Sequence, residues 1–258
     1  FVAVAFVLQI GMALYDTCTD GLALDTTPHE EKGKIQGFMV GGRAVGVVIT
    51  ASAVGFLADK VSWMAVFWLL AVLTLLPLPF VLSMKEADRP VERSFNWGAF
   101  KAFKQPQVIT LAIMGLIFFL IIAGTNQIVN PYLTDKFKIS LSTAGNFTTI
   151  WGIGAVTGGI FGGWLVTKIG DRRATFTALM VSMVSILALA FTPSLLLAWP
   201  IVFFFGLSYS TYQTVYFALA MGYTDPRIAA SMFAILMAMS NIGQGIGMPL
   251  TGVLVDKG

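Results

Sequence analysis

Long apolar stretches separated by short polar connections dominate the sequence. Each stretch approaches or exceeds the about 20 residues that a helix needs to cross the hydrocarbon core of a bilayer. None shows the alternating pattern of a membrane barrel strand. The pattern therefore predicts an all-α membrane protein with about eight transmembrane helices, whose backbone groups are satisfied within each helix. The predicted spans are 1–26, 35–58, 63–84, 107–131, 142–167, 174–192, 196–222 and 229–255.

Composition supports a multi-pass membrane protein. Hydrophobic residues make up 57% of the 258 residues and charged residues only 11%, and the mean hydropathy is +0.81. A soluble domain needs about 25% charged residues to cover its surface. One histidine and one cysteine, Cys18, exclude a disulfide framework and the usual His- or Cys-based metal cages. We expect no cofactor and no metal.

Basic residues divide unequally between the two sets of connections. Four connections (28–34, 85–106, 168–173 and 224–228) contain eleven lysines and arginines, and the opposite set contains four. This excess predicts that the first set is cytoplasmic and that both chain ends face outward. It also explains the net charge of +3 without a nucleic-acid partner.

The longest connection, 85–106, follows three predicted spans and precedes five. Phe1 falls inside an apolar stretch with no preceding Met, so we expect an internal fragment of a longer protein. Residues 55–60 and 252–257 match at four of six positions, 197 residues apart. Chance is one explanation, and a parallel repeat of two helical halves is the other.

Short motifs resemble the major facilitator superfamily. Residues 28–37 with Gly41, Gly42, Arg43 and Gly46 resemble its loop 4–5 and helix 5, and residues 163–173 resemble its cytoplasmic loop signature. The resemblance implies helices 4 to 11 of that fold. Residues 1–84 would then belong to the N-terminal half, 85–106 to the central linker and 107–258 to the C-terminal half.

Two further features bear on this resemblance. Thr167 stands where the superfamily's loop signature normally has an acidic residue, which puts that gate contact in doubt. Residues 15–28, with Asp16, Asp20 and Asp25, are similar to the acid-rich fourth helix of muropeptide permeases, acetyl-CoA transporters and pigment-carrier relatives. No substrate is carried over from this similarity.

Charged residues inside predicted spans are the first candidate site. Asp16 and Asp20 lie four residues apart on one helix face. Arg43 lies about as far from the intervening turn as Asp16 does, so the two are expected at nearly equal depth on antiparallel helices. A charge at mid-bilayer costs about 2.5–3.5 kcal/mol on insertion scales and must face protein or water. A substrate or coupling-ion site and a structural ion pair both fit this pattern.

Other polar residues lie in the fourth, seventh and eighth predicted spans, and the resemblance places the first, fourth and seventh spans around a central cavity. We expect substrate or coupling-ion contacts there, with interhelical hydrogen bonding as the alternative. These candidates are Asn126, Asn130, Tyr209, Gln213, Asn241 and Gln244.

Two further groups have expected structural roles. Glycines with four-residue spacing predict close packing of helix backbones: Gly37, Gly41, Gly42, Gly46, Gly154, Gly158, Gly159 and Gly162. The loop signature implies a gating loop at Gly163, Gly170, Asp171, Arg172 and Arg173.

The combined features favour a secondary active transporter that moves a small solute by alternating access, coupled to protons or another ion. The alternative is a non-transporting membrane assembly or pigment-delivery factor on the same fold. The sequence has no metal cluster, nucleophile elbow or phosphate loop, so we expect no enzyme. We expect a monomer in the lipid bilayer of the plasma (inner) membrane, with no nucleic-acid partner.

The charge distribution gives a test of topology. Cysteines introduced at positions 95 and 171 should resist an impermeant thiol reagent added to intact cells, and one at position 137 should react. Outside labelling at 95 and 171 would reverse the predicted orientation.

Overall fold

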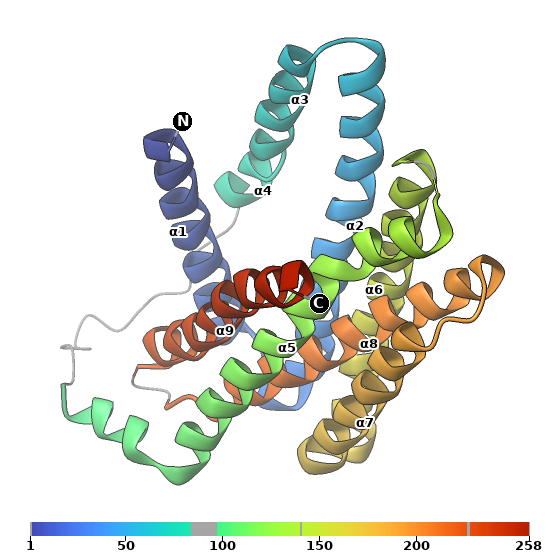
Figure 1. The fold of residues 1–258 in the computed structure, drawn as a ribbon. Helices are drawn as coiled ribbons and strands as arrows, with labels where there is room; N and C mark the ends of the chain where they lie inside the picture. The colour runs from blue at the N-terminus through green and yellow to red at the C-terminus, as the bar shows by residue number, and fades with distance from the viewer. Residues whose placement is uncertain (1, 84–96, 140, 226–227, 258) are drawn as a thin grey trace.

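The computed structural model describes residues 2–83, 97–139, 141–225 and 228–257, and these residues form helices and short connections (Figure 1). The central linker falls largely on 84–96, outside the described residues. The α-helices are α1 (Val2–Thr26), α2 (Lys32–Lys60), α3 (Trp63–Leu75), α4 (Leu78–Ser83), α5 (Pro106–Phe137), α6 (Leu141–Ile169), α7 (Asp171–Ala190), α8 (Leu195–Gly222) and α9 (Ala229–Lys257), with 3-10 turns at His29–Glu31 and Trp97–Lys104.

Local signals account for several helix ends. Ser62 precedes α3 and its hydroxyl accepts a hydrogen bond from the backbone N–H of Ala65, 3.2 Å away. Ser194 caps α8 in the same way through Leu197. Serine at this position satisfies an N–H that the helix itself leaves unpaired. Gly170 separates α6 from α7 with a φ of 77°, a conformation that favours glycine.

The helices cover all eight predicted spans, with corrections at prolines. Six described spans are both long and apolar enough to cross a membrane, and α1 and α2 are 25 and 29 residues long. The span 63–84 divides into α3 and α4 at Leu76 and Pro77, because proline supplies no N–H for a continuing helix. The predicted end at Pro131 is wrong, since α5 continues through Pro131 to Phe137.

Helix α6 is the element around which the others are arranged. It packs against both α2 and α8, while α7 packs on α8 and α5 packs along α9. α1 lies against α9, and α3 and α4 stand away from the rest of the helices (Figure 1). Large apolar side chains of α3 and α4, such as Trp68 and Phe80, are exposed, as expected for a surface that faces lipid.

Glycines bring the backbones of α2 and α6 into contact on one face of α6. A Cβ added at Gly159 would lie 2.8 Å from the backbone nitrogen of Gly41, and one at Gly37 would lie 2.9 Å from the carbonyl oxygen of Gly159. A Cβ added at Gly163 would likewise collide with the carbonyl oxygen of Gly33. No side chain larger than hydrogen fits at these positions without movement of a backbone.

A second set of glycines brings α6 against α8. A Cβ at Gly154, Gly158 or Gly162 would collide with the backbone carbonyl of Phe203, Leu207 or Thr211, one helical turn after another. Gly42 and Gly46 do not take part in either contact, and no described residue lies within 4 Å of a Cβ added at either position. Their expected role in packing stays a prediction.

Glycines also bring the backbones of α5 and α9 together, a contact that the sequence analysis does not predict. A Cβ at Gly243 or Gly247 of α9 would meet the carbonyl of Leu116 or Leu120 of α5. The four-residue spacing of Gly243 and Gly247 is the signal that marks this contact.

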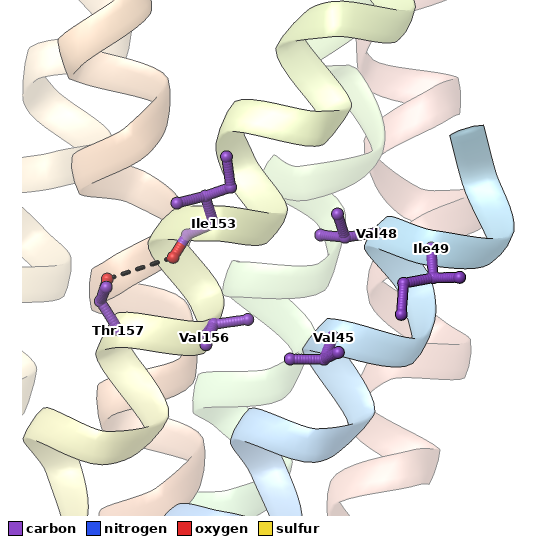
Figure 2. Close-up of a pocket in the computed structure, with 6 residues that line it drawn as sticks. All are labelled: Val45, Val48, Ile49, Ile153, Val156 and Thr157. Atoms are coloured by element: carbon purple, nitrogen blue, oxygen red, sulfur yellow. Dashed lines mark hydrogen bonds between the residues drawn. The ribbon is translucent and has the colours of Figure 1, made fainter.

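An apolar pocket of about 250 Å³ lies between α2 and α6, further from the α2 start than the glycine contact. Figure 2 shows its lining side chains on the two helices. Its wall is apolar apart from Thr157, whose hydroxyl donates to the carbonyl of Ile153 in its own helix. The lining residues are Val45, Val48, Ile49, Ile153, Val156 and Thr157.

The glycine geometry predicts opposite results at two positions. Gly159→Ala should lower the thermal unfolding midpoint of the detergent-solubilised protein, because overpacking costs about 1–3 kcal/mol. Gly42→Ala is the matched control and should leave the midpoint unchanged or raised, since alanine favours a helix by about 1 kcal/mol over glycine. Equal midpoints for the two variants would contradict the backbone contact.

Candidate functional site

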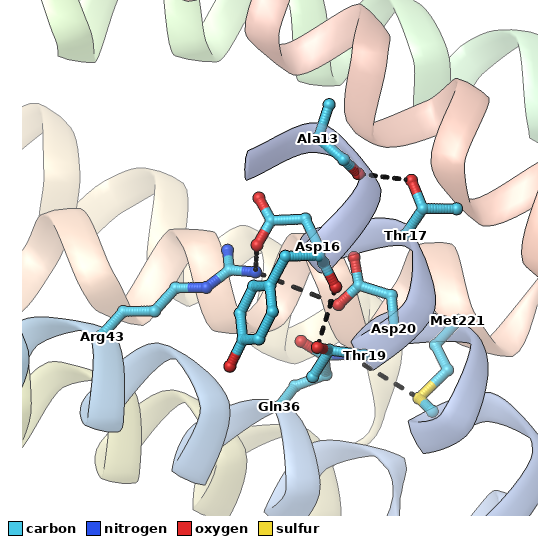
Figure 3. A network of polar contacts seen from close by, with 9 residues as sticks. Ala13, Asp16, Thr17, Thr19, Asp20, Gln36, Arg43 and Met221 are labelled. Atoms are coloured by element: carbon cyan, nitrogen blue, oxygen red, sulfur yellow. Dashed lines mark hydrogen bonds and ion pairs between the residues drawn. The ribbon is translucent and has the colours of Figure 1, made fainter. Parts of the chain in front are cut away.

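Asp16 and Asp20 of α1 and Arg43 of α2 form a charged cluster (Figure 3). One guanidinium nitrogen of Arg43 lies 3.2 Å from a carboxylate oxygen of Asp16 and 4.0 Å from one of Asp20. The Asp20 side chain is 7% exposed, while those of Asp16 and Arg43 are 29% and 39% exposed. One cation is thus shared by two carboxylates, and the more distant carboxylate is the more deeply buried.

Helix geometry creates this arrangement. Residues four apart lie on one face of a helix, so Asp16 and Asp20 both point toward Arg43. The nearby hydroxyls of Thr17 and Thr19 donate to the carbonyls of Ala13 and Tyr15 in their own helix, at 2.8 and 2.9 Å. Because these hydroxyl protons are engaged elsewhere, Arg43 is the group that the described residues place within 4.0 Å of the two carboxylates.

A second pocket, of about 300 Å³, lies between α2, α5, α6 and α8. It brings together two of the predicted residues, Asn126 and Asn130. The Asn130 amide donates to the hydroxyl of Thr148 at 2.9 Å. We call this the amide pocket; its lining residues are Val47, Asn126, Val129, Asn130, Phe147, Thr148, Trp151 and Val202.

The amide pocket and the charged cluster meet through α2. Val47 follows Arg43 by four residues, which places both on one face of α2, one helical turn apart. Tyr209, another predicted residue, contacts the pocket through Trp151, with the two rings edge to face and their centroids 5.5 Å apart.

Three predicted residues lie elsewhere. Gln213 is half-buried on α8, Gln244 is half-buried on α9, and Asn241 is exposed on α9. None of them lines the amide pocket as the described residues define it. The sequence predicts the helix on which each residue lies, but the side of the helix that the residue faces depends on packing.

An ion pair joins α2 to α7 at the predicted cytoplasmic end of the bundle. The ammonium of Lys32, at the start of α2, lies 3.0 Å from a carboxylate oxygen of Asp171, at the start of α7. Their side chains are 10% and 35% exposed. One turn further along α2, the buried Gln36 amide donates to the sulfur of Met221 on α8 at 3.9 Å.

Within the predicted gating loop, Asp171 makes the ion pair with Lys32, while Arg172 and Arg173 are exposed. Thr167, in the place of the acidic residue, bonds to the carbonyl of Gly163 at 2.9 Å.

The sequence predicts a connection at 28–34, which contains Lys32, and assigns no role to Gln36. Both residues lie at four-residue spacing with Val40 and Ala44 along α2, and all four are buried.

Comparison with known proteins agrees with the fold. The Major Facilitator Superfamily model matches residues 1–248. The chain is 26% identical over 191 residues to the sialic acid transporter NanX of Escherichia coli K12, covering 72% of this chain and 47% of the transporter. It is 25% identical over 286 residues to the anhydromuropeptide permease of the same strain, covering 98% of this chain and 54% of the permease.

A third relative is an uncharacterized MFS-type transporter of Bacillus subtilis strain 168, YbcL, 23% identical over 271 residues, covering all of this chain and 66% of the relative. The chain spans about half the length of the first two relatives. With the all-helical fold and its long apolar spans, the match to nearly the whole chain means that this integral, multi-pass membrane protein belongs to the major facilitator superfamily.

Proposed function

We propose that the chain is part of a secondary active transporter that moves a small solute by alternating access, with protons as the coupling ion. The observation that carries this proposal is that Asp16 and Asp20 share one cation, Arg43. Transport requires no enzymatic step, and the chain acts as a monomer in the bilayer.

The depth of the cluster suits coupling. Asp16 lies ten residues before the end of α1 and Arg43 eleven residues after the start of α2, which places both about 15 Å from the predicted cytoplasmic ends of their helices. The hydrocarbon core is about 30 Å thick. A group at this depth can exchange protons with water on either side as the access path changes.

Protonation changes the charge balance of the cluster. With both carboxylates ionised, one guanidinium faces two negative charges. A proton taken up by Asp20 leaves Arg43 paired with Asp16 alone, and the cluster becomes neutral. A proton on Asp16 as well frees Arg43 to bind an anionic group of the solute. Release of the protons on the other side restores the original ion pairs.

Alternating access needs a closed end that can open. We infer that residues 1–84 and 107–258 move as two halves and that Lys32 and Asp171 hold them together at the predicted cytoplasmic end. The contact joins α2 to α7, and the glycine contact between α2 and α6 lies directly behind it. Glycine faces allow two helices to slide or tilt without steric interlocking of side chains.

Two relatives carry a solute in their names, sialic acid for one and anhydromuropeptides for the other. These are the first solutes to test on this carrier. Uptake of either by vesicles that contain the full-length protein would separate a transporter from a non-transporting assembly factor.

The charged cluster predicts a separation of accumulation from exchange. In the full-length protein, Asp20→Asn, which is nearly isosteric with the protonated acid, should abolish proton-driven accumulation while sparing solute exchange at equilibrium. Asp135→Asn is the matched control, because Asp135 is 86% exposed and pairs with Lys138 at the other end of the bundle. Undiminished pH-dependent accumulation in both Asp16→Asn and Asp20→Asn would reduce the cluster to a structural ion pair.

The Lys32–Asp171 pair predicts a change in access. A cysteine placed at position 36, with Cys18 replaced by serine, should react slowly with a thiol reagent because Gln36 is 2% exposed. Lys32→Ala should raise that rate roughly 5–30-fold, corresponding to about 1–2 kcal/mol of lost stabilisation of the closed end.

The charge-exchanged double variant, Lys32→Asp with Asp171→Lys, should restore slow labelling. Lys138→Ala, which removes an exposed ion pair at the other end, is the control. An unchanged labelling rate in both Lys32→Ala and Asp171→Asn would show that the pair does not hold this end closed.

A further inference from the structure

The turn between α6 and α7 carries three cations that the protein leaves without partners. Lys168 lies in the last turn of α6, and Arg172 and Arg173 lie in the first turn of α7, beyond Gly170. All three side chains are exposed, and within the described part of the chain none of them makes an ion pair or a side-chain hydrogen bond. We call Lys168, Arg172 and Arg173 the basic corner.

The acidic residue of the same turn does not neutralise the basic corner. The carboxylate of Asp171 is engaged at 3.0 Å by the ammonium of Lys32. At the other end of the bundle, in contrast, Lys138 has a partner of its own and pairs with Asp135 at 2.6 Å. The positive charge of the basic corner is therefore open to a negative group from outside the chain.

The basic corner lies at the level of the lipid headgroups. Helix α7 has 20 residues (Asp171–Ala190) and is apolar enough to cross a membrane. At 1.5 Å per residue its length is about 30 Å, which equals the thickness of the hydrocarbon core. Because Arg172 and Arg173 are the second and third residues of this helix, they lie at the boundary of the core on the predicted cytoplasmic side.

An apolar face of α7 begins one turn after the arginines and continues along the helix. Phe176, four residues after Arg172 and three after Arg173, is 65% exposed, and residues at these spacings share one face of a helix. The opposite face, with Ala174 and Ala178, is buried, and α7 packs on α8. The exposed apolar face consists of Phe176, Met180, Met183, Val184 and Leu187. One side of α7 thus has a cationic head and an apolar body.

Helix α6 repeats this arrangement on its side of the turn. Trp164 lies four residues before Lys168, is 51% exposed and is stacked on Phe161 with a centroid distance of 5.7 Å. Tryptophan is enriched where the hydrocarbon core meets the headgroups. Both helices therefore place an exposed aromatic ring one turn deeper in the bilayer than a cation without a partner.

We propose that the basic corner binds the phosphate of an anionic phospholipid of the cytoplasmic leaflet, with one acyl chain along the exposed apolar face of α7. The two guanidinium groups can donate paired hydrogen bonds to phosphate oxygens, and Lys168 adds a third positive charge. A zwitterionic lipid carries its own ammonium, which would lie against three cations. The site therefore favours a headgroup with net negative charge.

This surface lies outside the proposed transport cycle. The ion pair at the closed end uses Asp171 of the same turn and neither arginine. The lipid surface can therefore be tested by binding alone, without a measurement of flux, and its failure would leave the coupling mechanism untouched.

Native mass spectrometry of the detergent-solubilised full-length protein tests the proposal, with dioleoylphosphatidylglycerol and dioleoylphosphatidylcholine as probes. The wild type should bind the anionic phosphatidylglycerol more tightly. Arg172→Ala combined with Arg173→Ala should weaken phosphatidylglycerol binding about 10–30-fold, as expected for the loss of two cations near an anionic surface, and should leave phosphatidylcholine binding unchanged. Arg172→Gln with Arg173→Gln, which keeps long polar side chains, replaces the alanine variant if that variant fails to show cooperative thermal unfolding.

Lys101→Ala combined with Lys104→Ala is the matched control. It also removes two exposed lysines, from another connection predicted to be cytoplasmic, and should bind phosphatidylglycerol as the wild type does. Equal loss in the arginine and lysine variants would show a diffuse attraction to net charge and overturn the site. Equal affinity of the wild type for the two lipids, or displacement of phosphatidylglycerol by an equal concentration of inorganic phosphate, would also overturn it.

Discussion

The close contact of the α6 backbone with two other helices is the constraint on which the rest of the structure depends. Lipid tails are as apolar as leucine side chains, so helices in a bilayer associate through van der Waals packing and not through the hydrophobic effect. Gly159 and Gly163 remove the side chains on the face toward α2, and Gly154, Gly158 and Gly162 remove them on the face toward α8. The positions of α2 and α8 follow from these two faces. The Lys32–Asp171 ion pair and the Trp151–Tyr209 contact are reached only because the backbones approach so closely.

Ionised groups inside the bundle are confined to places where protein charge or water can compensate them. Asp20 is buried, and its nearest opposite charge is 4.0 Å away and already engaged with Asp16 at 3.2 Å. A cluster built only for stability would give each buried carboxylate its own cation, because an uncompensated buried charge costs about 3–5 kcal/mol. On the proposed function, this unequal sharing would let the cluster respond to a single proton or to a competing anion, as a coupled carrier requires.

Sequence reasoning succeeded where one periodicity or one count decides the outcome. The spans follow from apolar length, and the meeting of Asp16 and Arg43 follows from equal counts of residues to the turn that joins α1 and α2.

Sequence reasoning failed where packing decides between sequence patterns that look the same. Gly37 with Gly41 and Gly42 with Gly46 have the same spacing, but they lie on different faces of α2 and only the first pair meets α6. Pro131 is accommodated inside α5 whereas Pro77 separates α3 from α4, and the residue type alone does not distinguish the two. The indole N–H of Trp151 has no hydrogen-bond partner among the described residues, and the sequence does not reveal this because helices far apart in the chain surround the ring.

Helix α2 joins the three features that transport would use. Lys32 and Gln36 make the contacts at the predicted cytoplasmic end, Arg43 belongs to the charged cluster, and Val47 lines the amide pocket. Coupling between sites requires an element with two arrangements whose balance each site can bias. On the proposed transport function α2 would be that element, because a tilt about its glycine contact with α6 would move its start, the Arg43 guanidinium and Val47 together. A bound solute and a proton on the cluster would then act on the same motion.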